Sequence, residues 1–375
     1  MRHWYEEYRE EILTAGLSGL LLALSFPPYP TRFFCCFALV PVFRYLIVRF
    51  DGREARERDE RTTSLKRFFF VGYLTGLVFS LLLLYWVANL IPASSAKMPW
   101  ILGPAVVVLS LYLALYTGLF SFAIAVLVKR WGLAALIAAP AFWSLTELMR
   151  GRGELGFPWG LISSSLAVHP VAIQGVSMYG SFGLSFVIVM VNLSIATLLF
   201  MRSKPIRVFS LVLMLIVVVG HLVWGAAEIK RVESNGRTLG GTAAIIQPNL
   251  DLAIKWKREY RDSIFTQLEQ LTRDAAERDV ILVIFPETAV PISFKFATLY
   301  RERLRLVALS EGVDLLTGHV DHIEIDGEWH AYNSASLFDS DGALQATYHK
   351  MNLLPFGERI PLSQFFPVFS KIDFG

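Results

Sequence analysis

Apolar residues are crowded into the first part of the chain, up to about residue 225, and polar residues return at ordinary density after it. The apolar runs are long enough for membrane-spanning helices, each of which needs roughly 20 apolar residues. About seven runs predict spans, at residues 11–27, 32–49, 68–91, 100–128, 132–149, 181–200 and 206–225. The pattern predicts a transmembrane helical domain over residues 1–225 and a water-soluble domain over residues 226–375.

The soluble part alternates β-branched runs with amphipathic stretches, which is typical of an α/β domain. Strands are predicted at residues 243–247, 281–285 and 313–317, and helices at residues 258–278 and 296–311. Gly318 is expected to end the third strand. Asp326-Gly327 predicts a hairpin turn, and an antiparallel pair follows at residues 332–338 and 343–350.

Lysine and arginine collect in the connections after the second, fourth and sixth predicted spans, at residues 51–67, 129–130 and 202–207. The positive-inside rule places these alternate connections in the cytoplasm. The N-terminus is then also cytoplasmic, and the soluble domain, after an odd number of spans, is periplasmic. The pattern predicts a multi-pass protein of the bacterial inner membrane. Within it, the Gly72-x-x-x-Gly76 spacing allows close approach of two helices.

Composition agrees with membrane embedding, since 54% of the 375 residues are hydrophobic, against roughly 45–50% in soluble domains. A formal net charge of +3 is too small to predict nucleic-acid binding. Cys35 and Cys36 are adjacent in an apolar run, and we interpret them as packing residues. His319, Asp321 and His322 follow a predicted strand, where alternating side chains argue against a shared metal, and we expect no metal and no cofactor.

Glu287 is the first candidate for chemistry, because it follows Pro286 at the carboxyl end of the strand at residues 281–285. Sites in layered α/β domains collect at such strand ends. A carboxylate desolvated beside an apolar strand can act as a general base. The alternative is a solvated loop residue, or a charge at the start of a helix.

Three segments extend this observation: Phe-Pro-Glu-Thr at 285–288, Tyr-His-Lys at 348–350 and Pro-Phe-Gly-Glu at 355–358. Together they resemble the nitrilase, or carbon–nitrogen hydrolase, superfamily. With a membrane-embedded first half, the chain resembles the apolipoprotein N-acyltransferase family in particular. The resemblance implies a nitrilase-like αββα sandwich, here partial, and a Glu-Lys-Cys triad in which Glu287 is the base and Lys350 stabilises the oxyanion. Glu358 would orient the amine or Lys350.

The resemblance also implies substrate-binding residues in both domains. Glu147 and Arg150, three residues apart on one helix face, can pair with each other. In the family an E-x-x-R segment precedes G-F-P-W, which here makes Glu147, Arg150, Phe157, Pro158 and Trp159 part of a lipid-facing floor. The alternative is a snorkelling pair at the interface, with Trp159 in the aromatic belt.

In the soluble domain the family places a tryptophan near the substrate entrance, which corresponds to Trp256; by itself this residue reads as a surface anchor. No cysteine follows Cys36. We therefore expect that the sequence is truncated before the nucleophilic cysteine, or belongs to a catalytically dead relative, and that the chain as given is inactive.

The family function implied is the last step of lipoprotein biosynthesis. A thiolate takes the acyl chain of a membrane phospholipid as a thioester, and the α-amine of a diacylglyceryl-apolipoprotein then accepts it. We expect these two partners, a monomer and no nucleic acid. Two alternatives remain: a membrane-anchored nitrilase- or amidase-like hydrolase, and a non-enzymatic membrane protein or transporter. Apart from Arg44, no ionisable residue is expected at mid-membrane, and this argues against a transporter.

Overall fold

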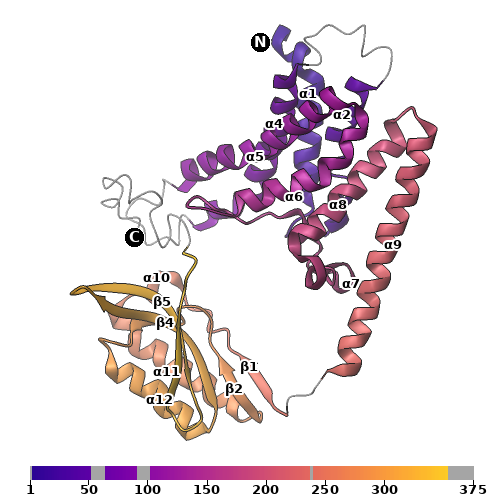
Figure 1. Cartoon of the computed structure of the whole chain (residues 1–375). Helices are drawn as coiled ribbons and strands as arrows, with labels where there is room; N and C mark the ends of the chain where they lie inside the picture. The colour runs from indigo at the N-terminus through magenta and orange to yellow at the C-terminus, as the bar shows by residue number, and fades with distance from the viewer. Residues whose placement is uncertain (1, 52–63, 91–101, 237–239, 354–375) are drawn as a thin grey trace. The chain divides into compact units, whose positions relative to one another are not determined.

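The computed structural model describes residues 2–51, 64–90, 102–236 and 240–353 of the chain (Figure 1). The chain forms two compact units. The first comprises Met1–Ile91 with Trp100–Gly236 and is helical, and the second comprises Pro92–Pro99 with Arg237–Gly375 and contains a β-sheet. The predicted fold class, a membrane-type helical bundle followed by an α/β domain, is confirmed.

The helical unit combines α-helices with short 3₁₀-helices. Its elements are α1 (Arg2–Leu24), η1 (Arg32–Cys36), α2 (Val40–Phe50), α4 (Leu65–Leu83), η2 (Tyr85–Leu90), α5 (Leu102–Trp131), η4 (Leu133–Ala138), α6 (Ala139–Arg150), η5 (Ile162–Leu166), α7 (Pro170–Ile173), α8 (Val176–Phe200) and α9 (Lys204–Asn235). Helix α9 continues past residue 225, where the sequence pattern places the end of the transmembrane domain.

Within the described residues, five helical segments are long and apolar enough to cross a membrane. They are Arg32–Phe50, Leu65–Leu83, Gly103–Trp131, Val176–Phe200 and Lys204–Asn235.

Each of these five segments overlaps a predicted span, but the count of seven is not confirmed. The run at residues 11–27 falls in α1, whose first half is charged, and the run at 132–149 is divided between η4 and the 12-residue helix α6. Pro140 lies in the first turn of α6, a position that suits proline and that separates the two pieces.

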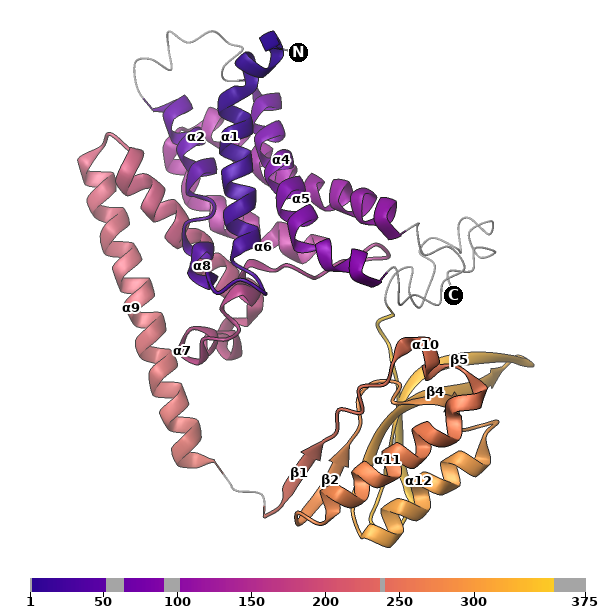
Figure 2. The ribbon, with the colours of Figure 1, turned by 180° about the vertical axis from the view of Figure 1, so that it is seen from behind.

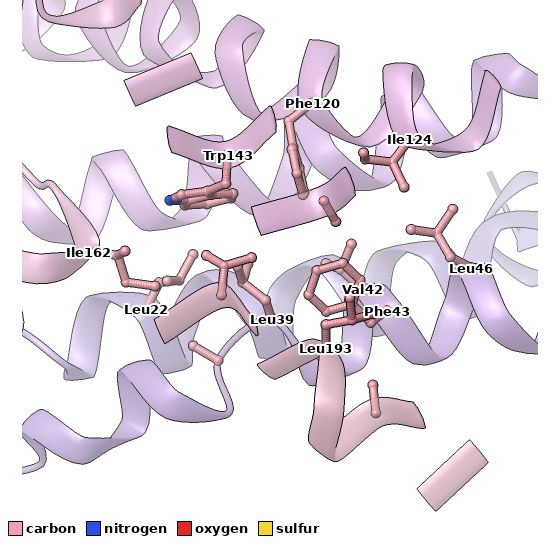
Figure 3. Close-up of a cluster of buried hydrophobic side chains, with 14 of the residues drawn as sticks. Leu22, Leu39, Val42, Phe43, Leu46, Phe120, Ile124, Trp143, Ile162 and Leu193 are labelled. Carbon is pink, nitrogen blue, oxygen red and sulfur yellow. The ribbon is translucent and has the colours of Figure 1, made fainter. Parts of the chain in front are cut away.

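The interior of the helical unit is a cluster of buried apolar side chains (Figure 3). Phe120 of α5 lies edge-on to Trp143 of α6, with ring centroids 5.1 Å apart. Helix α4 lies so close to α5 at Gly72 and Gly76 that a Cβ atom at either position would overlap Thr117. This is the close approach that the G-x-x-x-G spacing predicts.

The charged half of α1 is paired inside the helical unit. Glu11 is 1% exposed and accepts a hydrogen bond of 2.9 Å from Arg67 of α4. Glu10 forms ion pairs with Arg49 (2.6 Å) and Arg44 (3.3 Å) of α2. Arg44 therefore has a partner that hydropathy could not reveal. Because breaking a buried pair leaves an uncompensated charge, these contacts tie α1 to α2 and α4.

The second unit is built on a six-stranded sheet with the strand order β1-β2-β4-β5-β6 and with β3 paired to β4. Strands β1 to β4 pair in parallel, and β5 and β6 extend the sheet antiparallel. Its elements are β1 (Thr242–Ile245), α10 (Leu252–Lys255), η6 (Arg258–Tyr260), α11 (Arg261–Ala276), β2 (Val280–Ile284), β3 (Val290–Ser293), α12 (Thr298–Glu311), β4 (Asp314–Ile325), β5 (Glu328–Phe338) and β6 (Leu344–His349).

Helices α11 and α12 cover one face of the sheet (Figure 2). Leu268 of α11 and Leu304 of α12 are fully buried with Val283 of β2 and Leu315 of β4. Burying one such side chain contributes about 1.5–3 kcal/mol relative to leaving it in water. This core holds β2 against the first part of β4, and so fixes the place where the chain leaves β2.

Two strands differ from the expectation. Strand β4 does not end at Gly318 but continues to Ile325, and Gly318 pairs with Ala335 of β5. Strand β3 was not expected, because the prolines at positions 286 and 291 indicate strand ends. Its pairing with β4 is interrupted between Val290 and Ser293, where Pro291 has no N–H to donate. The hairpin turn at Asp326-Gly327 is confirmed between β4 and β5.

Candidate active site

Glu287 lies in a turn immediately after β2. The Phe285 amide donates to Leu316 (2.8 Å) and the Ala289 amide donates to Pro286 (3.2 Å), which closes the turn. Thr288 has φ 50°, in the left-handed region that is unfavourable for a β-branched residue. The neighbouring strand therefore holds the turn in a conformation that its own sequence does not favour.

Gly318 lies directly against this turn. A Cβ atom at position 318 would be 2.6 Å from the Pro286 carbonyl oxygen and 2.8 Å from the Glu287 Cα atom. Both neighbours are backbone atoms, so no side-chain rotation could relieve the overlap. Glycine here allows β4 to pass beneath the Glu287 turn and to continue, which is why the predicted end of that strand at Gly318 is wrong.

Lys350 and Glu287 lie together, as the predicted triad requires. The Lys350 Nζ atom is 3.0 Å from Oε1 of Glu287. The side-chain amide of Asn333, on β5, donates to the same Oε1 atom. The Lys350 backbone amide donates to the Asn333 carbonyl oxygen over 2.9 Å. Sequence reasoning identified two of these three residues and missed Asn333, whose position opposite Lys350 is visible only in the strand pairing.

The Glu287 side chain is 60% exposed and that of Lys350 is 31% exposed. The apolar strand beside Glu287 therefore does not desolvate it within the described part of the chain, contrary to the environment that the sequence indicates. Glu358, the third predicted residue of this group, lies outside the described residues.

Trp256 and Lys255 follow β1 in the same unit. The Lys255 Nζ atom lies 5.6 Å from the centre of the Trp256 ring, and Trp256 is 49% exposed. Burial lowers the pKa of Lys255, and the negative charge of Glu287 acts in the opposite direction. Lys255 is therefore a second lysine within electrostatic reach of Glu287. Sequence reasoning did not single it out, although it precedes the candidate tryptophan.

Polar side chains of β4, β5 and β6 form hydrogen bonds with one another across the strands. His319 is 1% exposed and its Nε2 atom is 2.8 Å from Ser336 Oγ. Ser336 bonds to Thr347 (2.8 Å), and Ser334 bonds to His349 (2.8 Å). These cross-strand pairs fix the register of β5 and β6, and so the place of Lys350. The described residues contain no cluster of three His, Cys, Asp or Glu suited to a metal ion.

In the helical unit, Glu147 and Arg150 are buried at the end of α6, with 4% and 7% exposure. The expected ion pair between them is not formed within 4 Å. Instead, Glu147 Oε1 accepts a hydrogen bond from the Ile162 amide (2.8 Å), and Arg150 donates to the Gly160 carbonyl oxygen (3.1 Å). Spacing along a helix predicts that two side chains share a face, but it cannot show that a following loop returns to bind both.

The returning loop carries the predicted aromatic residues. The Trp159 ring stacks on Trp86 of η2 at a centroid distance of 5.1 Å, and Phe157 lies 5.6 Å from Trp159. Pro158 and Trp159 help to line a cavity of about 300 Å³, with an apolar wall that includes Phe26. The structure thus brings the five predicted residues of the helical unit into one local arrangement, and places Glu287, Lys350 and Trp256 in the second unit.

The chain is similar to known proteins along almost its whole length. Residues 18–194 match the apolipoprotein N-acyltransferase N-terminal domain, and residues 242–371 match the carbon-nitrogen hydrolase family. Apolipoprotein N-acyltransferase of Allorhizobium ampelinum is 33% identical over 359 residues, which are 93% of this chain and 65% of the relative. That of Geobacter metallireducens is 30% identical over 377 residues, 98% of this chain and 68% of the relative.

The chain spans about two thirds of the length of these curated relatives. Among solved structures, an amidase from Nesterenkonia sp. is 21% identical with a TM-score of 0.23, and the match covers 32% of this chain and 44% of the amidase. A similarity of that size carries no argument about fold or function.

Proposed function

The chain belongs to the apolipoprotein N-acyltransferase family, and we propose that it serves the transfer of an acyl chain from a membrane phospholipid to the α-amine of a diacylglyceryl-apolipoprotein. The observation that supports this most is the Glu287–Lys350 pair, 3.0 Å apart, in a unit of carbon–nitrogen hydrolase type. Among the described residues, five membrane-type helical segments precede that unit, as a phospholipid donor requires.

The two paired side chains have separate tasks in this proposal. Glu287 takes the proton of the attacking thiol, and the thiolate attacks the ester carbonyl carbon of the phospholipid. The negative charge that develops on the carbonyl oxygen is stabilised by the Lys350 ammonium. Glu358 orients the amine or Lys350. The carbon–oxygen bond of the ester then breaks, and Glu287 returns the proton to the oxygen of the leaving lysophospholipid. The apolipoprotein amine next attacks the thioester carbonyl carbon and gives up a proton to Glu287, and the carbon–sulfur bond breaks, which releases the thiol and leaves the amide.

The helical unit supplies the contact with lipid in this proposal. Glu147 and Arg150 hold the loop that presents Phe157, Pro158 and Trp159, and these apolar side chains contact the donor's acyl chain. Trp256 lines the entrance for substrate on the second unit. The protein acts in the bacterial inner membrane as a monomer, with the second unit on the periplasmic side.

The thiol is the component that residues 226–375 do not contain, since the two cysteines of the sequence are Cys35 and Cys36. Cys35 is fully buried in the helical unit. A polypeptide of residues 1–375 is therefore expected to form no hydroxylamine-sensitive acyl-enzyme with a fluorescent phospholipid. Labelled protein that loses its label when Cys35 and Cys36 are both replaced by alanine would locate the nucleophile in the helical unit instead.

The proposed base is tested by Glu287→Gln in the full-length protein. An amide cannot accept the thiol proton, so acyl-enzyme formation should fall about 10²–10⁴-fold. The matched control is Glu302→Gln on α12, which removes an exposed carboxylate that binds Arg305 and should leave the rate unchanged. An undiminished rate in Glu287→Gln would remove Glu287 from the mechanism. Release of free fatty acid without transfer to the apolipoprotein would favour an amidase-like hydrolase.

A further inference from the structure

The two oxygens of the Glu287 carboxylate are in different situations. Oε1 accepts a hydrogen bond from the Lys350 ammonium (3.0 Å) and another from the Asn333 amide. In the part of the chain that the structure describes, Oε2 accepts no hydrogen bond, and the side chain is 60% exposed. One oxygen is thus held by two donors, while the other is open to an incoming group.

Asn333 is itself firmly placed. It lies in the middle of β5, where it pairs with Val320 of β4 on one side. On the other side its carbonyl oxygen accepts the Lys350 amide (2.9 Å). The next residue, Ser334, bonds to His349 of β6 (2.8 Å), which prevents slippage of the strand pair. A one-residue slip would turn every side chain of the strand to the other face, so the register that sets Lys350 also sets Asn333.

Asn333 lies beside both residues of the proposed catalytic pair but takes no part in the proposed bond changes. Its side chain reaches the carboxylate of Glu287, whereas its main chain binds Lys350, so it contacts both members of the proposed catalytic pair. An amide N–H is uncharged and cannot itself take up a proton. A donor of this kind favours the ionised carboxylate without adding a titratable group. Among the described residues, Lys350 and Lys255 are the charged groups near the same carboxylate.

We propose that Asn333 is a positioning residue that assigns the two oxygens of Glu287 to different tasks. Together with Lys350 it anchors Oε1, so that Oε2 is the atom that takes the proton of the nucleophile. In that step the bond between hydrogen and the nucleophile breaks and an O–H bond forms at Oε2. The electron pair left on the nucleophile attacks the acyl carbon, and the neutral acid stays oriented by the amide on Oε1. This inference rests on the proposed function of Glu287.

The test is the pH dependence of acyl-enzyme formation in full-length Asn333→Asp. This nearly isosteric change replaces the N–H donor with an oxygen and places a second carboxylate beside Glu287, and both effects favour the protonated acid. The acid limb of the pH–rate profile should move to higher pH by about one unit, which is a tenfold loss of rate on that limb. Asn333→Ala, which loses the donor but adds no charge, should move the limb in the same direction by less.

Gln270→Glu is the matched control. Gln270 on α11 donates through its side-chain amide to the Asp274 carboxylate (2.8 Å) on an exposed helix surface. The substitution makes the same chemical change as Asn333→Asp, away from Glu287, and should leave the profile in place. Thermal unfolding of each purified variant identifies a folding defect, and if Asn333→Asp does not fold, Asn333→Ala decides the question by itself.

The outcomes separate this inference from the proposed function. An acid limb that stays in place in the folded Asn333 variants, with Glu287→Gln still inactive, overturns the role of Asn333 and leaves Glu287 as the base. A wild-type rate in Glu287→Gln overturns the proposed function and this inference together. A limb that moves equally in Gln270→Glu also overturns the inference, because the shift would then be a general effect of added charge.

Discussion

At the scale of single residues, Gly318 decides where the Glu287 carboxylate can lie, although it has no side chain to take part in chemistry. The turn at 286–289 passes so close to β4 that even a methyl group at this position would meet its backbone. Thr288 is at the same time held at φ 50°. The geometry of the Glu287 turn therefore depends on contact with another strand rather than on its own residues.

Gly318→Ala should shift the turn and lower both stability and activity. Forcing a group into a packed site costs about 1–3 kcal/mol, and displacement of Glu287 from Lys350 should reduce acyl-enzyme formation at least tenfold. Thermal unfolding and single-turnover labelling of the full-length protein would measure the two effects. Gly240→Ala is the control, since a Cβ atom there meets no atom within 4 Å. Equal behaviour of the two variants would contradict this account.

His319 makes stability depend on pH. Burial lowers its pKa below the value of about 6.5 that is expected in the unfolded chain. The unfolded state then binds more protons, so the stabilising contribution is complete above about pH 6.5 and is lost as the pH falls. The unfolding temperature should drop between pH 7 and 5, and His319→Gln, which can still bond to Ser336, should show a smaller drop. His330→Gln, at an exposed position, should behave as wild type.

At the scale of elements, α6 is short and ends in two buried charges that bind the loop following it. Glu147 accepts a hydrogen bond from the Ile162 amide at the start of η5, and Arg150 donates one to the Gly160 carbonyl oxygen. The helix thus acts as a support for the segment that carries Trp159. A hydropathy window shows the same residues only as an apolar run with two charges whose burial is energetically unfavourable.

Glu147→Ala should release the loop, because the Ile162 amide would be left buried without an acceptor. Such a loss costs about 1–3 kcal/mol, and the stacking of Trp159 on Trp86 should loosen. Tryptophan fluorescence and thermal unfolding in detergent would report both changes. Glu147→Gln keeps an acceptor oxygen and should be milder, and Arg152→Gln, at an exposed position, is the neutral control. A Glu147→Ala protein as stable as Arg152→Gln would rule out the support.

At the scale of the whole molecule, the distribution of basic residues predicts which side of the membrane each connection occupies. A reporter fused after Gly236, where α9 has ended, should be active in the periplasm, and one inserted within residues 51–67 should be cytoplasmic. Reporters that are active on the same side of the membrane at both positions would mean that the number of spans between them is even.

The sequence by itself determined the two-part architecture, the α/β class of the second part and Glu287 as a candidate, and the resemblance of its motifs to a known family added Lys350. These depend on local information: apolar run length, strand and helix periodicity, and motif residues beside a strand end. The Gly72-x-x-x-Gly76 spacing also allowed close approach of two helices, and only the structure identified α5 as the partner of α4.

Only the tertiary structure decided which partners these residues meet. Asn333 comes to Glu287 through the register of β4, β5 and β6, and Gly318 comes beneath the Glu287 turn because β4 continues past it. Glu10 and Glu11 find arginines on other helices, and Glu147 binds a returning loop instead of Arg150. Each of these contacts joins residues that are far apart in the chain or separated by a turn, and their distance is set by packing, which a one-dimensional pattern does not contain.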